Sequence, residues 1–177
     1  MPEDRIRPDP EREALELWEA GRLAEAEQKY REAFALTADG QWGRPHIRAG
    51  LASILAAQGK AAEALTEFET TLREELALSG DDHASPSVMV ARYFLAEHLL
   101  HLGRPSDALA VLAPSLGSEG DFSLRLVEAR ACAASGDTRR ATAVLQALLE
   151  RATSDEQRAD LERQIQVVNT GSEPNAG

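Results

Sequence analysis

One phrase occurs four times along this chain, and it limits the possible folds more than any other feature of the sequence. Each copy is centred on a glycine, with one alanine seven residues before it and a second alanine five residues after it. A large apolar residue follows the second alanine by four positions. The glycines are Gly21, Gly59, Gly103 and Gly136, the second alanines are Ala26, Ala64, Ala108 and Ala141, and the large residues are Tyr30, Phe68, Leu112 and Leu145. Such an internal repeat predicts a chain built from similar structural units.

The repeated phrase predicts a helical hairpin. Apolar residues before each glycine recur at helical spacing, as Leu51 and Leu55 do. The glycine can adopt the positive φ that ends a helix, and a second amphipathic helix follows after a few residues. A single hairpin leaves its apolar face uncovered, so we expect successive hairpins to stack on one another.

The pattern predicts eight paired helices and a ninth that covers the last hairpin. The ninth helix, at 155–168, begins with Ser154 and Gln157 at the spacing of a capping box. The eight paired helices are expected at 10–20, 23–37, 44–58, 61–78, 86–102, 105–116, 121–135 and 138–152. The corresponding domain plan is a flexible N-terminus at 1–7, a repeat domain at 8–168 with hairpins at 8–40, 43–80, 85–118 and 121–152 and a capping helix at 154–168, and a disordered tail at 169–177.

The motif A-x-x-L…G-x-x-x-x-A-x-x-x-[YFL] resembles the tetratricopeptide repeat over roughly residues 8 to 152. The segment LSGDDHASPSVMVARYFLA, residues 78–96, is similar to the linker and helix of kinesin-light-chain-like repeat proteins, including bacterial ones. Gly50 and Phe94 replace an asparagine of that family. The resemblance implies an all-α fold, a right-handed α-solenoid of about four hairpins plus the capping helix. It also implies a concave groove lined by the first helix of each hairpin.

Composition excludes several classes of protein. The 177 residues include 30 acidic and 19 basic side chains, and the net charge of −11 argues against a nucleic-acid partner. No apolar run has the length of a membrane span, and the N-terminus lacks the apolar core of a signal peptide, so we expect a cytoplasmic protein without a membrane partner. Cys132 is the single cysteine, which excludes a disulfide framework. It occupies a core position of the repeat, where a buried and unreactive thiol is expected.

The sequence contains no established catalytic motif, and we expect neither enzymatic activity nor a cofactor. The strongest candidate for metal chemistry is the segment EHLLH, in which Glu97, His98 and His101 are helical neighbours. A small metal-dependent enzyme centred on these three residues is therefore an alternative. The competing interpretation is an ordinary polar helix surface.

The resemblance assigns the groove to particular positions of each first helix. Among them, Trp18 and Tyr93 are expected to anchor a partner, because aromatic side chains dominate interface hot spots. The groove lacks the Lys/Asn cluster that grips a C-terminal carboxylate in chaperone-binding members of the family. The expected groove residues are Glu11, Leu15 and Trp18, then His46, Ala49, Ser53 and Ala56, then Val90, Tyr93, Glu97 and Leu100 with His101 beside them, and finally Ser123, Leu126, Arg130 and Ala133.

Three arginines, Arg48, Arg92 and Arg125, share one position of the repeat, four residues before an alanine. In stacked hairpins they could form a ladder that selects a partner with carboxylates or phosphates. The alternative is that each arginine pairs with acids of its own surroundings, for instance Arg92 with Asp81 or Asp82.

The sequence therefore predicts a non-catalytic scaffold that binds a peptide segment or protein partner in its groove. Two alternatives are self-association and a regulatory module that acts with a separate effector polypeptide. We expect a monomer or a weak dimer, and the sequence does not identify the partner.

Overall fold

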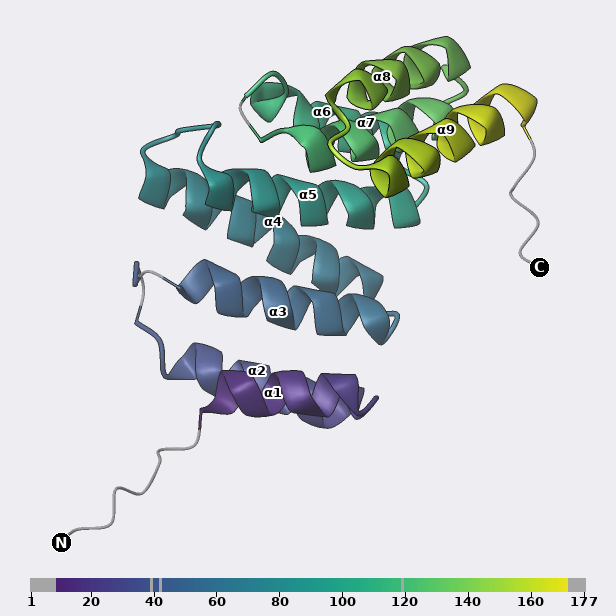
Figure 1. Ribbon diagram of the computed structural model, residues 1–177. Coiled ribbons are helices and arrows are strands. Elements are labelled where there is room, and N and C mark those ends of the chain that lie inside the picture. Colours follow the sequence, from purple (N-terminus) through teal and green to yellow (C-terminus); the bar gives the residue numbers. More distant parts are fainter. Residues whose placement is uncertain (1–8, 39, 42, 119, 172–177) are drawn as a thin grey trace, which may run out of the picture. The chain divides into compact units, whose positions relative to one another are not determined.

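The computed structural model describes residues 9–38, 40–41, 43–118 and 120–171. Within these residues the secondary structure consists of nine α-helices and one 3-10 turn, and the predicted all-α fold is confirmed (Figure 1). The helices are α1 (Pro10–Glu19), α2 (Leu23–Ala35), α3 (Arg44–Ala57), α4 (Ala61–Ser79), α5 (Pro86–His101), α6 (Pro105–Leu112), α7 (Phe122–Ala134), α8 (Thr138–Arg151) and α9 (Asp155–Thr170). The 3-10 turn Ala113–Ser115 contains Pro114 and replaces the predicted end of α6, because proline cannot continue the helical hydrogen bonding.

The chain divides into two compact units, Met1–Asp81 and Asp82–Gly177. The first unit contains the hairpins α1–α2 and α3–α4, with α2 packed on α3. The second contains the hairpins α5–α6 and α7–α8, with α7 packed on both α5 and α6, and α9 packed on α8. The predicted flexible N-terminus lies outside the described residues. Of the predicted tail, Asn169 and Thr170 continue α9 and Gly171 ends it, while 172–177 lie outside the described residues.

All four hairpins close in the same way. Each repeat glycine has a positive φ, between 68° at Gly103 and 86° at Gly136. The amide of the next residue reaches back five positions, as in Lys60 N to Leu55 O at 2.9 Å, which is the bond of a Schellman motif. The two repeat alanines flanking each turn are buried in every hairpin, where the helices approach closely. The repeat read from the sequence is therefore a repeat of backbone geometry and of packing.

The ninth helix has the predicted start. Ser154 Oγ accepts a hydrogen bond from Gln157 N at 3.2 Å, while Gln157 Oε1 accepts one from Thr153 N at 2.9 Å. The Gln157 side chain therefore bonds to the amide of Thr153, the residue before the N-cap, whereas a standard capping box uses the amide of the N-cap itself. Leu161 of α9 is buried with Leu145 and Leu148 of α8, so α9 covers the apolar face of the last hairpin.

Glu27 of α2 joins the two hairpins of the first unit. Its carboxylate accepts hydrogen bonds from Lys60 Nζ at 2.7 Å, from Arg31 Nη2 at 2.8 Å and from Gln58 Nε2 at 3.0 Å. The bond from Lys60 is the main reason that the pKa of Glu27 falls to about 2, with Arg31 and Gln58 adding to it against the effect of burial.

The lowered pKa predicts a pH dependence of stability. Glu27 is ionised in the folded chain down to about pH 2, whereas an unfolded glutamate takes up a proton near pH 4.3. Its contribution is therefore present above about pH 4.3 and is lost as the pH falls to 2, by up to about 3 kcal/mol. Denaturant unfolding at several values between these pH limits should show that the free energies of unfolding of wild type and Glu27→Gln become more similar as the pH falls. The exposed Glu69→Gln control on α4 should not alter the pH profile, and an unchanged profile in Glu27→Gln would contradict the prediction.

Candidate functional site

In the second unit, α5 and α7 bring two predicted groove residues together. Arg130 Nη1 of α7 donates a hydrogen bond to Glu97 Oε1 of α5. The two residues lie in different hairpins, 33 positions apart in the sequence. The ion pair therefore joins one residue of α5 and one residue of α7 that the sequence assigned to the groove.

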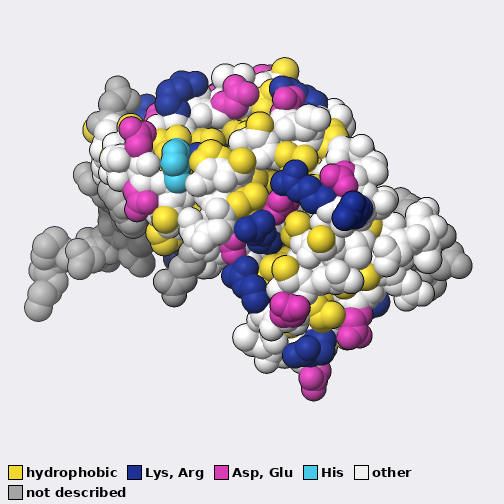
Figure 2. All heavy atoms as spheres, turned by 90° about the horizontal axis from the view of Figure 1, so that it is seen from above, with side chains coloured by type: hydrophobic (Ala, Val, Ile, Leu, Met, Phe, Trp, Pro, Cys, Tyr) yellow, Lys and Arg dark blue, Asp and Glu magenta, His cyan; other side chains and the backbone are white. Residues whose placement is uncertain are grey.

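Apolar side chains are exposed on the same face of α5. Val90 is 55% exposed and Phe94 is 39% exposed. With Glu97 and His101 they occupy positions i, i+4, i+7 and i+11, which form one stripe along a helix. We name Val90, Phe94, Glu97, His101 and Arg130 the α5–α7 surface. On the face of the molecule displayed in Figure 2, apolar side chains likewise reach the surface between acidic and basic ones.

Tyr93 is the predicted aromatic anchor, but its neighbour Phe94 is the more exposed of the two. Tyr93 is half-buried, and its ring meets Phe94 edge to face with the centroids 5.3 Å apart. Phe94 could have been found from its spacing, because it lies four residues after Val90 and three before Glu97. The edge-to-face contact with Tyr93 therefore supports the Phe94 ring.

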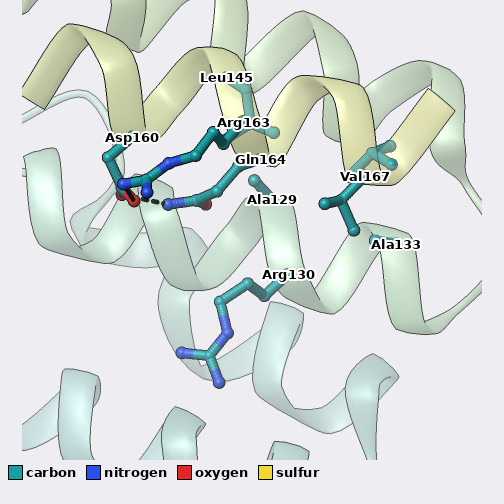
Figure 3. Close-up of a pocket in the computed structure, with 9 residues that line it drawn as sticks. Ala129, Arg130, Ala133, Leu145, Asp160, Arg163, Gln164 and Val167 are labelled. Atoms are coloured by element: carbon teal, nitrogen blue, oxygen red, sulfur yellow. Dashed lines mark hydrogen bonds and ion pairs between the residues drawn. The ribbon is translucent and has the colours of Figure 1, made fainter. Parts of the chain in front are cut away.

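A cavity of about 480 Å³ adjoins Arg130, between α7, α8 and α9 (Figure 3). Apolar groups of Ala129, Ala133 and Leu145 line it on the side of α7 and α8, and Val167 and Val168 line it on the side of α9. Asp160, Arg163 and Gln164 gather at one end, where Asp160 accepts bonds from Arg163 Nη2 at 3.0 Å and Gln164 Nε2 at 2.7 Å. The Arg130 side chain points away from these three residues. The arrangement suits an apolar side chain inside the cavity and a polar segment across its rim.

The first unit brings a second pair of predicted groove residues together. His46 Nε2 of α3 lies 3.2 Å from Glu11 Oε1 of α1. Leu15, four residues after Glu11 on α1, is exposed, and Trp18 of the same helix is half-buried. Ser53 is also half-buried, and its hydroxyl donates to the Ala49 carbonyl of its own helix at 2.9 Å. Of these residues, His46 and Glu11 are the two that the structure joins.

The three repeated arginines contact their own hairpins. Arg48 is mostly buried and pairs with Glu67 at 2.6 Å and Glu74 at 2.9 Å, both on α4. Arg125 is partly exposed and pairs with Asp121 at 3.0 Å and Glu128 at 2.9 Å.

Arg92 is buried and has different partners from the expected Asp81 and Asp82. It donates to the Val111 carbonyl of α6, and its Nη2 lies 2.9 Å from His83 Nδ1. Burial lowers the pKa of Arg92. Arg48 and Arg92 therefore present little surface to a partner.

Of the residues considered for a metal site, Glu97 and His101 share the exposed stripe of α5, whereas His98 does not belong to it. Glu97 pairs with Arg130, His98 is buried and His101 is exposed. In the part of the chain that the structure describes, no three His, Cys, Asp or Glu side chains converge as metal ligands. Cys132 is buried, and burial raises the pKa of its thiol. Among the described helices, none combines the length and the apolar composition of a bilayer span.

The comparisons with known proteins agree on one fold, that of tetratricopeptide-type repeats. Residues 45–70, 89–114 and 123–147 match the family model of the tetratricopeptide repeat. The chain is similar in structure to the kinesin light chain TPR-like repeats of Podosopora anserina, with a TM-score of 0.77 and 17% identity over 91% of this chain and 84% of that chain. It is also similar to BtubC (BKLC) from P. vanneervenii, with a TM-score of 0.68 and 17% identity over 93% of this chain and 81% of that chain.

A third similar structure is a double mutant of MamA RS-1, with a TM-score of 0.61 and 15% identity over 92% of this chain and 93% of that chain. At sequence identities of 15% to 17%, these similarities show the fold alone. No curated protein matches the chain in sequence.

Proposed function

The chain is a tetratricopeptide-repeat protein, and from this premise we propose that it is a non-catalytic scaffold that binds a peptide segment of a partner protein on the α5–α7 surface. Tetratricopeptide repeats are protein-interaction modules in general. The observation that carries the proposal is the exposed pair Val90 and Phe94 beside the Glu97–Arg130 ion pair. Aromatic side chains are enriched among the residues that dominate the binding energy of interfaces, so Phe94 is the proposed anchor.

The proposed surface is preformed. Val90, Phe94 and Glu97 lie within one helix, and Arg130 is held by its ion pair to that helix. A peptide therefore meets ordered side chains, and little receptor entropy is lost on binding. We assign an apolar side chain of the peptide to the cavity beside Arg130 and a polar segment to its rim.

The first unit supplies a second proposed contact area. There, Glu11, Trp18, His46 and Ser53 are the residues that the groove assignment selects, and the contact between His46 and Glu11 supports it. The acidic composition favours a protein partner over nucleic acid, and the cytoplasm is the proposed site of action. Light scattering at several concentrations would distinguish the proposed monomer from a weak dimer.

Replacing the two exposed apolar residues should weaken binding to the partner. Peptides selected on the purified chain from a random library should bind the double variant Val90→Ala/Phe94→Ala at least about tenfold more weakly, because the apolar anchor is lost. Isothermal titration calorimetry would measure the affinity. Leu78→Ala on α4 is the matched control, since Leu78 is also exposed but lies outside the proposed surface. Equal affinities of the double variant and the wild type would refute the proposal.

A further inference from the structure

We infer that the second unit carries a separate binding site, for an acidic segment of a partner protein, where three arginines surround an apolar cavity between α7 and α8. The cavity has a volume of about 290 Å³. It shares no lining residue with the α5–α7 surface or with the cavity under α9. We name the three arginines and the apolar residues between them the three-arginine site; its members are Arg125, Arg140 and Arg151 with Ala143, Val144, Ala147 and Leu148.

The geometry of the site follows from the spacing along α8. Arg140, Val144, Ala147 and Arg151 occupy positions i, i+4, i+7 and i+11, so they form one stripe with a cation at each end. At 1.5 Å per residue, the two ends lie about 16 Å apart along the helix axis. Arg125 joins the site from the neighbouring helix α7.

Two buried carboxylates hold the arginines in place. Glu128 accepts bonds from Arg140 Nη2 at 2.6 Å and from Arg125 Nη1 at 2.9 Å. Asp121 accepts bonds from Arg125 Nε at 3.0 Å and from Arg151 Nη1 at 2.9 Å. The result is an unbroken row of alternating charges, Arg140, Glu128, Arg125, Asp121 and Arg151. The row itself has three cations and two anions, and Asp137, whose carboxylate accepts a hydrogen bond from Arg140 N at 3.0 Å, is a further anion beside Arg140.

The arginines at the two ends of the row face solvent, while the two acids of the row do not. Asp121 and Glu128 are each 2% exposed, whereas the Arg140 and Arg151 side chains are 51% and 47% exposed. Each guanidinium has five N–H donors, so bonding to the buried acids leaves donors for a ligand. Because the arginines are already ordered, a carboxylate that binds them loses less of its binding energy to side-chain ordering.

This chemistry selects one kind of occupant, an extended segment with acidic residues flanking an aliphatic one. In an extended chain alternate side chains face the same side, so Glu-x-Leu-x-Glu directs all three toward α8, with the outer two about 13 Å apart. The glutamates then reach Arg140 and Arg151, and the leucine contacts Val144 and Ala147. The whole chain has a charge of −11, so acidic segments gain affinity only where their carboxylates meet these arginines.

The test uses the acetylated and amidated peptide Glu-Ala-Leu-Ala-Glu, titrated against the full chain and followed by NMR shifts of the α7 and α8 amides. Binding should weaken as salt rises from about 50 to about 300 mM. Replacing both peptide glutamates by glutamine should weaken it at least about tenfold, because the charge-assisted bonds are lost. Equal binding of the glutamine peptide would overturn the inference.

A matched pair of variants tests the location of the site. Ala147→Glu places a carboxylate among the arginines without removing any ion pair, and it should weaken peptide binding at least about tenfold. Ala62→Glu makes the same change at an exposed position of α4 in the other unit and should have no effect. Unchanged binding in Ala147→Glu, or displacement of the peptide by inorganic phosphate at equal concentration, would overturn the inference. Val90→Ala/Phe94→Ala should bind the acidic peptide normally, so this result is independent of the proposed function.

Discussion

Asp121→Ala should lower the free energy of unfolding by about 3 kcal/mol, because it removes a buried carboxylate that accepts three hydrogen bonds. Asp121 accepts bonds from Gly117 N at 2.8 Å, from Arg151 Nη1 at 2.9 Å and from Arg125 Nε at 3.0 Å. Burial acts to raise the pKa of Asp121, but these bonds outweigh it and the pKa is lowered. The contribution is therefore present above an unfolded pKa of about 3.9 and is lost as the pH falls below that value. Urea unfolding at neutral pH would measure the change.

The control for Asp121 is Asp107→Ala on α6. Asp107 also pairs with an arginine, Arg104 at 2.6 Å, but both side chains are exposed. Exposed pairs contribute little to stability, so the control should change the free energy of unfolding by less than about 1 kcal/mol. Equal losses in the two variants would mean that the buried network does not stabilise the α7–α8 hairpin.

Gly50→Leu should destabilise the first unit by about 3 kcal/mol through overpacking. Gly50 lies in the middle of α3, and a Cβ atom at this position would meet Tyr30 Cε1 at 2.4 Å and Tyr30 Cζ at 2.7 Å. Tyr30 is itself buried on α2, so its ring cannot move aside without disturbing the core. Burial also raises the pKa of Tyr30. Thermal or urea unfolding would show the loss.

Two further variants separate overlap with Tyr30 from any general effect of a larger residue. Ala57→Leu adds a leucine at the exposed end of α3 and should be close to neutral. Combining Gly50→Leu with Tyr30→Ala makes room for the new side chain, so the double variant should be more stable than additivity of the two changes predicts. Additive losses would contradict the proposed clash.

The helices could be predicted because their boundaries depend on short-range features. A glycine five residues from each alanine is enough to set the hairpin turn, and the same backbone bond closes all four copies. The contact of Tyr30 with Gly50 could not be predicted, because it depends on how closely α2 approaches α3. That approach explains why a residue with a side chain would not fit at position 50.

Neither the exposure of Phe94 nor most of the arginine partners could be predicted. Repeat position identified Glu97 and Arg130, but spacing alone did not decide whether Tyr93 or Phe94 would be exposed. Several partners of the arginines come from distant parts of the sequence. Arg48 meets Glu74 across 26 positions, and Arg151 meets Asp121 across 30. Such pairs depend on the packing of whole helices rather than on a local pattern.

The ion pair between Glu97 and Arg130 has a consequence for how proteins of this design diverge. Because the two charges cancel, replacing Glu97 by glutamine leaves the positive charge of Arg130 unpaired, whereas replacing Arg130 by glutamine leaves the negative charge of Glu97 unpaired. A duplicated gene would need only one such replacement to favour acidic or basic partners. New specificity can therefore arise without remodelling the helices that present it.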